Sequence, residues 1–230
     1  MKLNSLTKFF LTVIVTFAAL SNVAYSQSAG DYYNNGLKAA QSKDFETAVA
    51  NFTKFIEMSP ADPDIVKAYN FRGKCYNYMN NYEAAIADFS KVIELNAGDP
   101  NIYISRAVAY DNMKDFANSI KDYSKAIELK SDNATFYFQR GIAYMNTLDT
   151  VKSIADYTKA IELKSDYAKA YLNRGNIYLD QNKYQDAIND YEKAISYESS
   201  YESDLRPVID KAKERMNLLN TQNTDDKKKP

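Results

Sequence analysis

Apolar residues recur at steps of three and four positions along most of the chain, in short stretches divided by polar breaks. This spacing puts them on one face of a helix and predicts amphipathic α-helices. In residues 168–201, for example, one stripe runs from Tyr171 to Leu179 and another from Ala187 to Ile195. Asp or Asn occupies the break between stripes and can cap the second helix: Asp44, Asn81, Asp115, Asp149 and Asn182. The pattern therefore predicts a series of helix–turn–helix units.

The pattern repeats every 34 residues. Four segments that start at Tyr69, Tyr103, Tyr137 and Tyr171 align without gaps, and "YFQRGIAYMNTLDTVKSIADYTKAIEL" from Tyr137 is typical of them. A weaker copy starts at Tyr33. One such unit cannot bury its apolar face alone, so neighbouring units are expected to stack into an elongated array.

These residues resemble the tetratricopeptide repeat, a 34-residue helix pair with the pattern aromatic…Leu-Gly…Tyr…Ala…Phe/Tyr…Ala…Pro. The small residue of the pattern, at the eighth repeat position, is Gly36, Gly73, Ala107, Gly141 and Gly175. Five units match within residues 27–201: 29–62, 66–99, 100–133, 134–167 and 168–201. The resemblance implies an all-α fold, a right-handed α-solenoid of five repeats plus a C-terminal capping helix. A solenoid of another class, such as Sel1-like repeats, is the structural alternative.

One departure from the family pattern involves charge. The seventh position, Leu in the family, is Arg in the last four units, and the twenty-third position is Asp in the same units. In the first unit the two positions are Asn35 and Asn51. Because Arg and Asp are present or absent together within one unit, we expect each Arg to pair with the Asp of its own unit. A row of arginines that binds an anionic ligand is the functional alternative.

The two ends of the chain differ from the repeats. Lys2 and Lys8 precede an apolar stretch, and Ala24 and Ser26 stand where a signal peptidase requires small residues. Residues 1–26 are therefore predicted to be a secretory signal peptide, and the apolar stretch is too short for a membrane anchor. Residues 202–220 continue an amphipathic stripe and are predicted to form the capping helix, and residues 221–230 a disordered tail.

Composition excludes several classes of function. The chain has no His and one Cys, which leaves no His-dependent catalytic triad, no disulfide within the chain and no Cys/His zinc site. It also lacks a glycine-rich phosphate-binding motif. Without residues 1–26 it carries 27 basic and 30 acidic residues, a net charge of −3, which argues against nucleic acid as a partner. No catalytic residue, metal site or cofactor is therefore predicted, and Cys75 is expected to be a buried thiol.

The resemblance also implies where a ligand would bind, because the first helices of such repeats line a concave groove. The family's ligand-contacting positions correspond here to Asn70, Lys74, Asn77, Ile104, Val108, Asp111, Phe138, Ile142, Met145, Leu172, Asn176 and Leu179. The middle of this set is apolar and its N-terminal part is polar. Some of its members can equally belong to the core between units. The lysine and asparagine set with which this family clamps chaperone tails is not matched.

The leading hypothesis is a non-enzymatic scaffold that binds a peptide or protein segment in this groove. The alternative is a module that binds glycan or another polymer of the cell envelope. The signal sequence predicts export, to the periplasm or the exterior of a Gram-negative bacterium, without stable membrane insertion after cleavage. The sequence does not identify the partner, and it leaves homo-oligomerisation through an uncovered end open.

Overall fold

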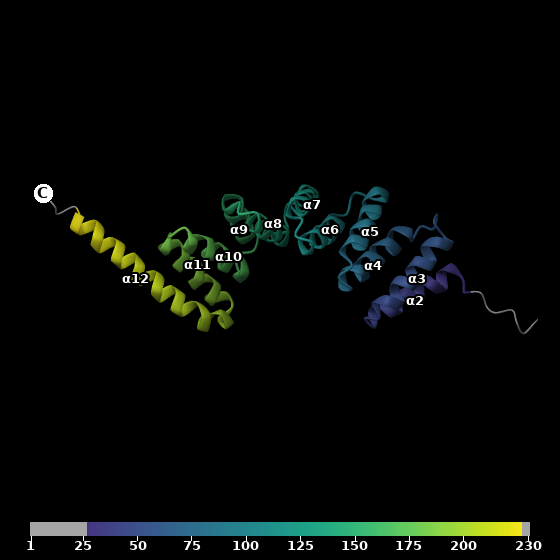
Figure 1. Ribbon diagram of the computed structural model, residues 1–230, viewed down its shortest axis with the longest axis horizontal. Coiled ribbons are helices and arrows are strands. Elements are labelled where there is room, and N and C mark those ends of the chain that lie inside the picture. The colour runs from purple at the N-terminus through teal and green to yellow at the C-terminus, as the bar shows by residue number, and fades with distance from the viewer. Residues whose placement is uncertain (1–26, 227–230) are drawn as a thin grey trace, which may run out of the picture.

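The computed structural model describes residues 27–226. The predicted signal peptide and residues 227–230 lie outside this part of the chain. Within it all regular elements are helical, and ten α-helices form five successive pairs in an elongated array (Figure 1). The pairs are α2 (Ala29–Gln41) with α3 (Phe45–Met58), α4 (Ile65–Tyr78) with α5 (Tyr82–Leu95), α6 (Pro100–Asn112) with α7 (Phe116–Leu129), α8 (Ala134–Asn146) with α9 (Thr150–Leu163), and α10 (Ala168–Asp180) with α11 (Tyr184–Tyr197). The predicted all-α solenoid is thus confirmed.

A longer helix closes the C-terminal end. After a short 3₁₀ turn, η1 (Ser199–Tyr201), α12 (Glu202–Asp226) packs against α11 and then extends beyond it (Figure 1). Helix α12 includes the predicted capping segment 202–220 and continues through residues 221–226, which the sequence analysis assigned to the tail. No Gly or Pro interrupts these residues, so nothing in them stops the helix. No helix within residues 27–226 is long and apolar enough to cross a membrane.

The turn inside each pair has one construction. A residue with φ near +60° reverses the chain in every turn: Lys43, Asn80, Lys114, Leu148 and Asn182. In the first four pairs the next residue, Asp or Asn, accepts a hydrogen bond from a backbone N–H of the second helix, as predicted. The prediction for Asn182 is wrong, because Asn182 is the left-handed residue and Lys183 is the N-cap of α11, without a side-chain cap hydrogen bond.

Small residues let the two helices of a pair approach closely. At Gly141 an added Cβ would lie 2.8 Å from Cε1 of the buried Tyr157 ring, so that ring fills the space that a larger residue would need. The Ser153 hydroxyl donates to the Gly141 carbonyl across the same contact, at 2.8 Å. Aromatic rings and small residues therefore form the interior of the array.

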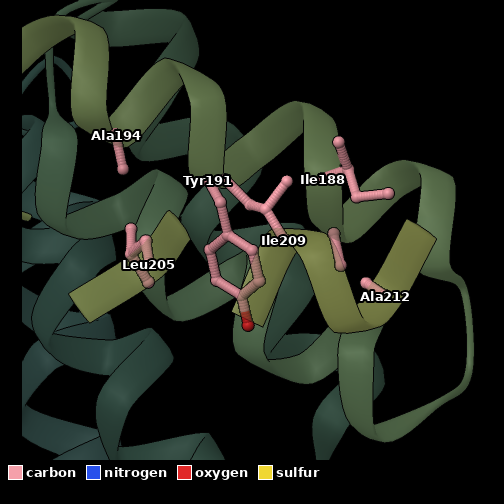
Figure 2. Packing of buried hydrophobic residues seen from close by; sticks show 7 residues of the cluster. Ile188, Tyr191, Ala194, Leu205, Ile209 and Ala212 are labelled. Carbon is pink, nitrogen blue, oxygen red and sulfur yellow. The ribbon is translucent and has the colours of Figure 1, made fainter. Parts of the chain in front are cut away.

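The last pair shows how the array is covered. Leu205, Ile209 and Ala212 of α12 pack against Ile188 and Tyr191 of α11, and all five are buried (Figure 2). One stripe of α12 thus takes the place of a further repeat. Other residues of α12 line the same surface as the first helices of the repeats.

Candidate functional site

Three clefts open between the first helices of consecutive units. We call the surface that contains them the groove face, formed by α4, α6, α8, α10 and α12. Each cleft lies between one first helix and the next. For this reason the side chains that line the clefts come from equivalent repeat positions. The groove face is the candidate site.

The N-terminal cleft lies between α4 and α6 and has a volume of about 390 Å³. It is lined by Lys74, Asn77, Tyr78, Ile104, Ser105, Val108 and Asn112. Four of these residues, Lys74, Asn77, Ile104 and Val108, belong to the predicted set. Lys74 is exposed, and its Nζ lies 5.9 Å from the centre of the Phe71 ring.

The middle cleft lies between α8 and α10, with a volume of about 220 Å³. It is lined by Ile142, Met145, Asn146, Tyr157, Asn173 and Asn176. The predicted residues Ile142, Met145 and Asn176 thus lie together here. Ile142 and Met145 are half-buried against the core, and Asn176 is exposed.

The C-terminal cleft is the largest, about 600 Å³, and lies between α12 and the ends of α10 and α11. It is lined by Leu179, Asn182, Tyr184, Pro207, Val208, Lys211, Ala212 and Arg215. Leu179 alone was predicted as a site residue. The five α12 residues were missed because residues 202–220 were predicted only to cap the array, although the apolar stripe of this helix was an available signal.

The other predicted residues line none of the three clefts. Phe138 is only 8% exposed and packs on the rings of Tyr157 and Tyr167, so it is core between units and its assignment to the ligand surface is corrected. Leu172 is half-buried against the α11–α12 cluster. Helix periodicity placed both residues on the correct side of their helices but could not show how closely the next unit covers them.

Three acceptor atoms on the groove face are buried and have no hydrogen-bond donor among the described residues: Asn70 Oδ1, Asn77 Oδ1 and Asp111 Oδ1. All three residues belong to the predicted set. Asn77 Nδ2 donates to the Ser105 carbonyl at 3.4 Å, and the other carboxylate oxygen of Asp111 accepts from the Tyr123 hydroxyl at 2.7 Å. A buried acceptor without a donor is costly. Of these three residues only Asn77 lines one of the three clefts.

Buried tyrosines support the polar side chains of this face. The Tyr191 hydroxyl donates to Asn176 Oδ1 at 2.8 Å, and Asn173 Nδ2 donates to the Tyr157 hydroxyl at 3.4 Å. Burial raises the pKa of Tyr191 to about 12, and it also raises the pKa of Tyr157. Burial raises the pKa of Asp111 as well, because no cation compensates for the lost water.

The arginines are not part of a ligand site. Each is bidentate to the Asp of its own unit; Arg140 Nε and Nη2, for example, donate to Asp156 at 2.8 Å each. The predicted pairing is confirmed in all four units: Arg72–Asp88, Arg106–Asp122, Arg140–Asp156 and Arg174–Asp190. A row of arginines available to an anion is therefore ruled out.

The sequence did not predict the second partner residue of each arginine. Arg140 Nη1 donates to the Ser124 hydroxyl of the preceding unit at 3.0 Å, and the other three make the same contact. The hydroxyls, all at the twenty-fifth repeat position, belong to Thr53, Ser90, Ser124 and Thr158. Each pair thus joins two units. The run of small hydroxyl residues in that position was the available signal.

The described residues offer little catalytic chemistry. Cys75 is buried, and burial raises the pKa of its thiol to about 11, so it is a poor nucleophile at neutral pH. Residues 27–226 contain no cluster of three or more His, Cys, Asp or Glu residues suited to a metal ion. The residues of the groove face are therefore suited to binding.

Comparison with protein families identifies the repeats. The tetratricopeptide repeat profile matches residues 66–99 and 168–201, and a second TPR repeat profile matches residues 113–147 and 151–182. Together these matches cover more than half of the chain. The chain belongs to the tetratricopeptide repeat (TPR) family. Membership of this family supports a role as a protein–protein interaction scaffold, and TPR proteins are generally not enzymes.

Solved TPR structures share this fold. A MamA crystal structure has 24% sequence identity and a TM-score of 0.68, covering 76% of this chain and 94% of its own. YrrB, described as a TPR protein with an unusual peptide-binding site, has 20% identity and a TM-score of 0.64, covering 80% and 92%. A TPR protein from Parabacteroides merdae has 14% identity and a TM-score of 0.69, covering 87% and 76%. Curated protein sequences give no match. At these identities the likeness establishes the fold alone.

Proposed function

We propose that this TPR chain is a non-enzymatic scaffold that binds a segment of a partner protein along the groove face. The observation that carries the proposal is the series of three clefts between first helices. Their side chains combine half-buried apolar groups with polar groups.

A polypeptide supplies what these clefts require. Its backbone N–H groups can donate to the amide oxygens of asparagines that line the clefts, while its side chains can contact their apolar residues. A rigid array of helix pairs is preorganised, so binding does not have to order the protein side of the contact. The peptide-binding site named for YrrB supports this reading by analogy.

Photo-crosslinking tests the proposal directly. A benzophenone amino acid at Met145, in the middle cleft, should crosslink one partner polypeptide in the source organism, to be identified by mass spectrometry. The same group at Val151, which is 77% exposed at the turn of the same unit, is the matched control and should not capture that partner. Adding Ile142→Glu should reduce the crosslink at least tenfold, because it puts a charge on a half-buried apolar surface. Crosslinks to glycan, or equal capture at both positions, would contradict peptide binding.

We also propose that the protein acts outside the cytoplasm. The arrangement of charge, apolar stretch and small residues before Gln27 supports export. Fractionation with N-terminal sequencing tests this proposal: the envelope or secreted fraction should contain a chain that starts at Gln27. An intact N-terminus in the cytoplasmic fraction would contradict it.

A further inference from the structure

The C-terminal cleft differs from the other two because two cations of α12 line it. Lys211 and Arg215 stand four residues apart, on the same side of one helix, beside the apolar surface of Leu179, Val208 and Ala212. The Tyr184 hydroxyl at this cleft donates to Asn182 Oδ1 at 2.8 Å, so its polar group is already satisfied. The cleft therefore combines an apolar interior with positive charge.

These two cations have no carboxylate partner among the described side chains. The ion pairs of α12 in that part of the chain are Arg206–Glu202 and Lys213–Glu192, at 3.2 and 3.6 Å. Some lysines elsewhere are paired along their own helix, as in Lys91–Glu94, Lys125–Glu128 and Lys159–Glu162, while others among the described residues have no ion pair. Like charges four residues apart on a helix repel each other. A carboxylate bound between Lys211 and Arg215 would remove that repulsion.

The position of the cleft makes it part of the groove face. Leu179 occupies the same repeat position as Asn77 of the N-terminal cleft and Met145 of the middle cleft. The stripe of Leu205, Ile209 and Ala212 is buried against α11 (Figure 2). Lys211 and Arg215 of the same helix line the cleft. Helix α12 is thus both the cap of the array and the last wall of the groove.

We infer that the C-terminal cleft binds a partner segment in which an apolar side chain stands next to an Asp or Glu. The apolar side chain enters the space lined by Leu179 and Val208, and the carboxylate lies between Lys211 and Arg215. This inference rests on the proposed function and specifies the chemistry of the segment at one end of the groove. The volume of about 600 Å³ is within the range of roughly 300–1,000 Å³ for ligand pockets.

A displayed library of random 12-residue peptides, fused to the coat protein through their C-termini, provides the test. Because of this fusion the peptides have no free C-terminal carboxylate, so only Asp and Glu side chains can supply a carboxylate to the cleft. The library is selected on the chain from Gln27 onward, which contains every described helix. Selected peptides should be enriched in Asp or Glu within two positions of a large apolar residue.

Matched variants of one helix then locate the contact. Peptides selected on the wild type should bind Lys211→Gln/Arg215→Gln about fivefold more weakly, the loss expected for two partly exposed charge contacts. Lys213→Gln removes a single positive charge outside the cleft, where Lys213 pairs with Glu192, and should alter affinity less than twofold. Gln is a good helix former, so these variants should keep α12 intact.

The possible outcomes separate this inference from the proposed function. Peptides without acidic enrichment, or peptides that the double variant binds equally well, would overturn the inference while leaving groove binding in place. Equal losses in Lys213→Gln would overturn it too, because they would indicate general surface charge. If the wild type selects no peptides at all, the proposed function fails and the inference fails with it.

Discussion

The first helix pair and the four pairs that follow it have the same fold but different interiors. In the later pairs an Arg–Asp pair crosses between the two helices, as Arg140–Asp156 does, and its side chains are only 19% and 8% exposed. In the first pair the same positions are Asn35 and Asn51, and Asn51 donates to a carbonyl of its own helix. A charged network thus begins only at the second unit.

This difference between the first pair and the later pairs indicates the role of the Arg–Asp–hydroxyl contacts. Each arginine joins its own Asp to a hydroxyl of the unit before it, and within residues 27–226 no helix pair precedes the first unit. The first unit therefore contributes only the hydroxyl of Thr53, to Arg72. At the other end the hydroxyl position is Glu192, which pairs with Lys213 of α12 instead. The network joins neighbouring units, so it is present where two units meet.

The largest expected effect comes from breaking one pair. Asp156→Ala should lower the free energy of unfolding by about 3 kcal/mol, because it leaves a mostly buried guanidinium without its carboxylate. Asn51→Ala, at the same position of the first unit, should cost less than 1 kcal/mol. Urea denaturation of both variants measures the contrast. Adding Arg140→Leu, the family's residue, should recover about half of the loss, and equal losses at Asp156 and Asn51 would contradict this account.

A smaller effect is expected at Asp111, a half-buried acid that has no ion pair with a described residue. Its pKa is raised by burial, so the folded state holds the proton more tightly than the unfolded state. Stability should therefore fall as the pH rises from the unfolded pKa through the folded pKa, and stay lower above it. Asp111→Asn should remove this penalty and stabilise the protein by about 1 kcal/mol at pH 7.

Thermal unfolding of wild type and Asp111→Asn between pH 4 and pH 7 measures this difference. The gain from the substitution should shrink toward pH 4, where the wild-type carboxyl becomes protonated. A gain that grows as the pH falls would contradict the sign of the shift.

The smallest expected effect concerns the turns. Four of the five left-handed positions are Lys or Asn, but the fourth pair has Leu148, with φ of 62° and an exposure of 81%. Asn tolerates this conformation better than Leu. Leu148→Asn should therefore stabilise the fold by about 0.5 kcal/mol, and Asn80→Leu should cost a similar amount. Differential scanning calorimetry of both variants tests this, and equal signs for the two would contradict it.

Much of the fold could be predicted because the repeat is local. The 34-residue period, the small residue beside a ring and the shared presence of Arg and Asp are visible in the chain. The site was harder to predict. Ile142 and Met145 line a cleft as expected, whereas Phe138, from the same stripe, is covered by Tyr157 and Tyr167. Helix periodicity gives the side on which a residue stands, and the neighbouring unit determines whether it is exposed.

By itself, then, the sequence determined the helices, their pairing and the partner of each arginine inside its unit. These features depend on contacts within about 34 residues, which the repeat shows several times over. Only the tertiary structure decided which hydroxyl accepts a hydrogen bond from each arginine and which first-helix side chains remain exposed. It also decided that α12 continues the groove face. Those outcomes depend on how one unit packs on the next. That packing is set by the fit of complete surfaces, which a pattern of residue types along one chain does not specify.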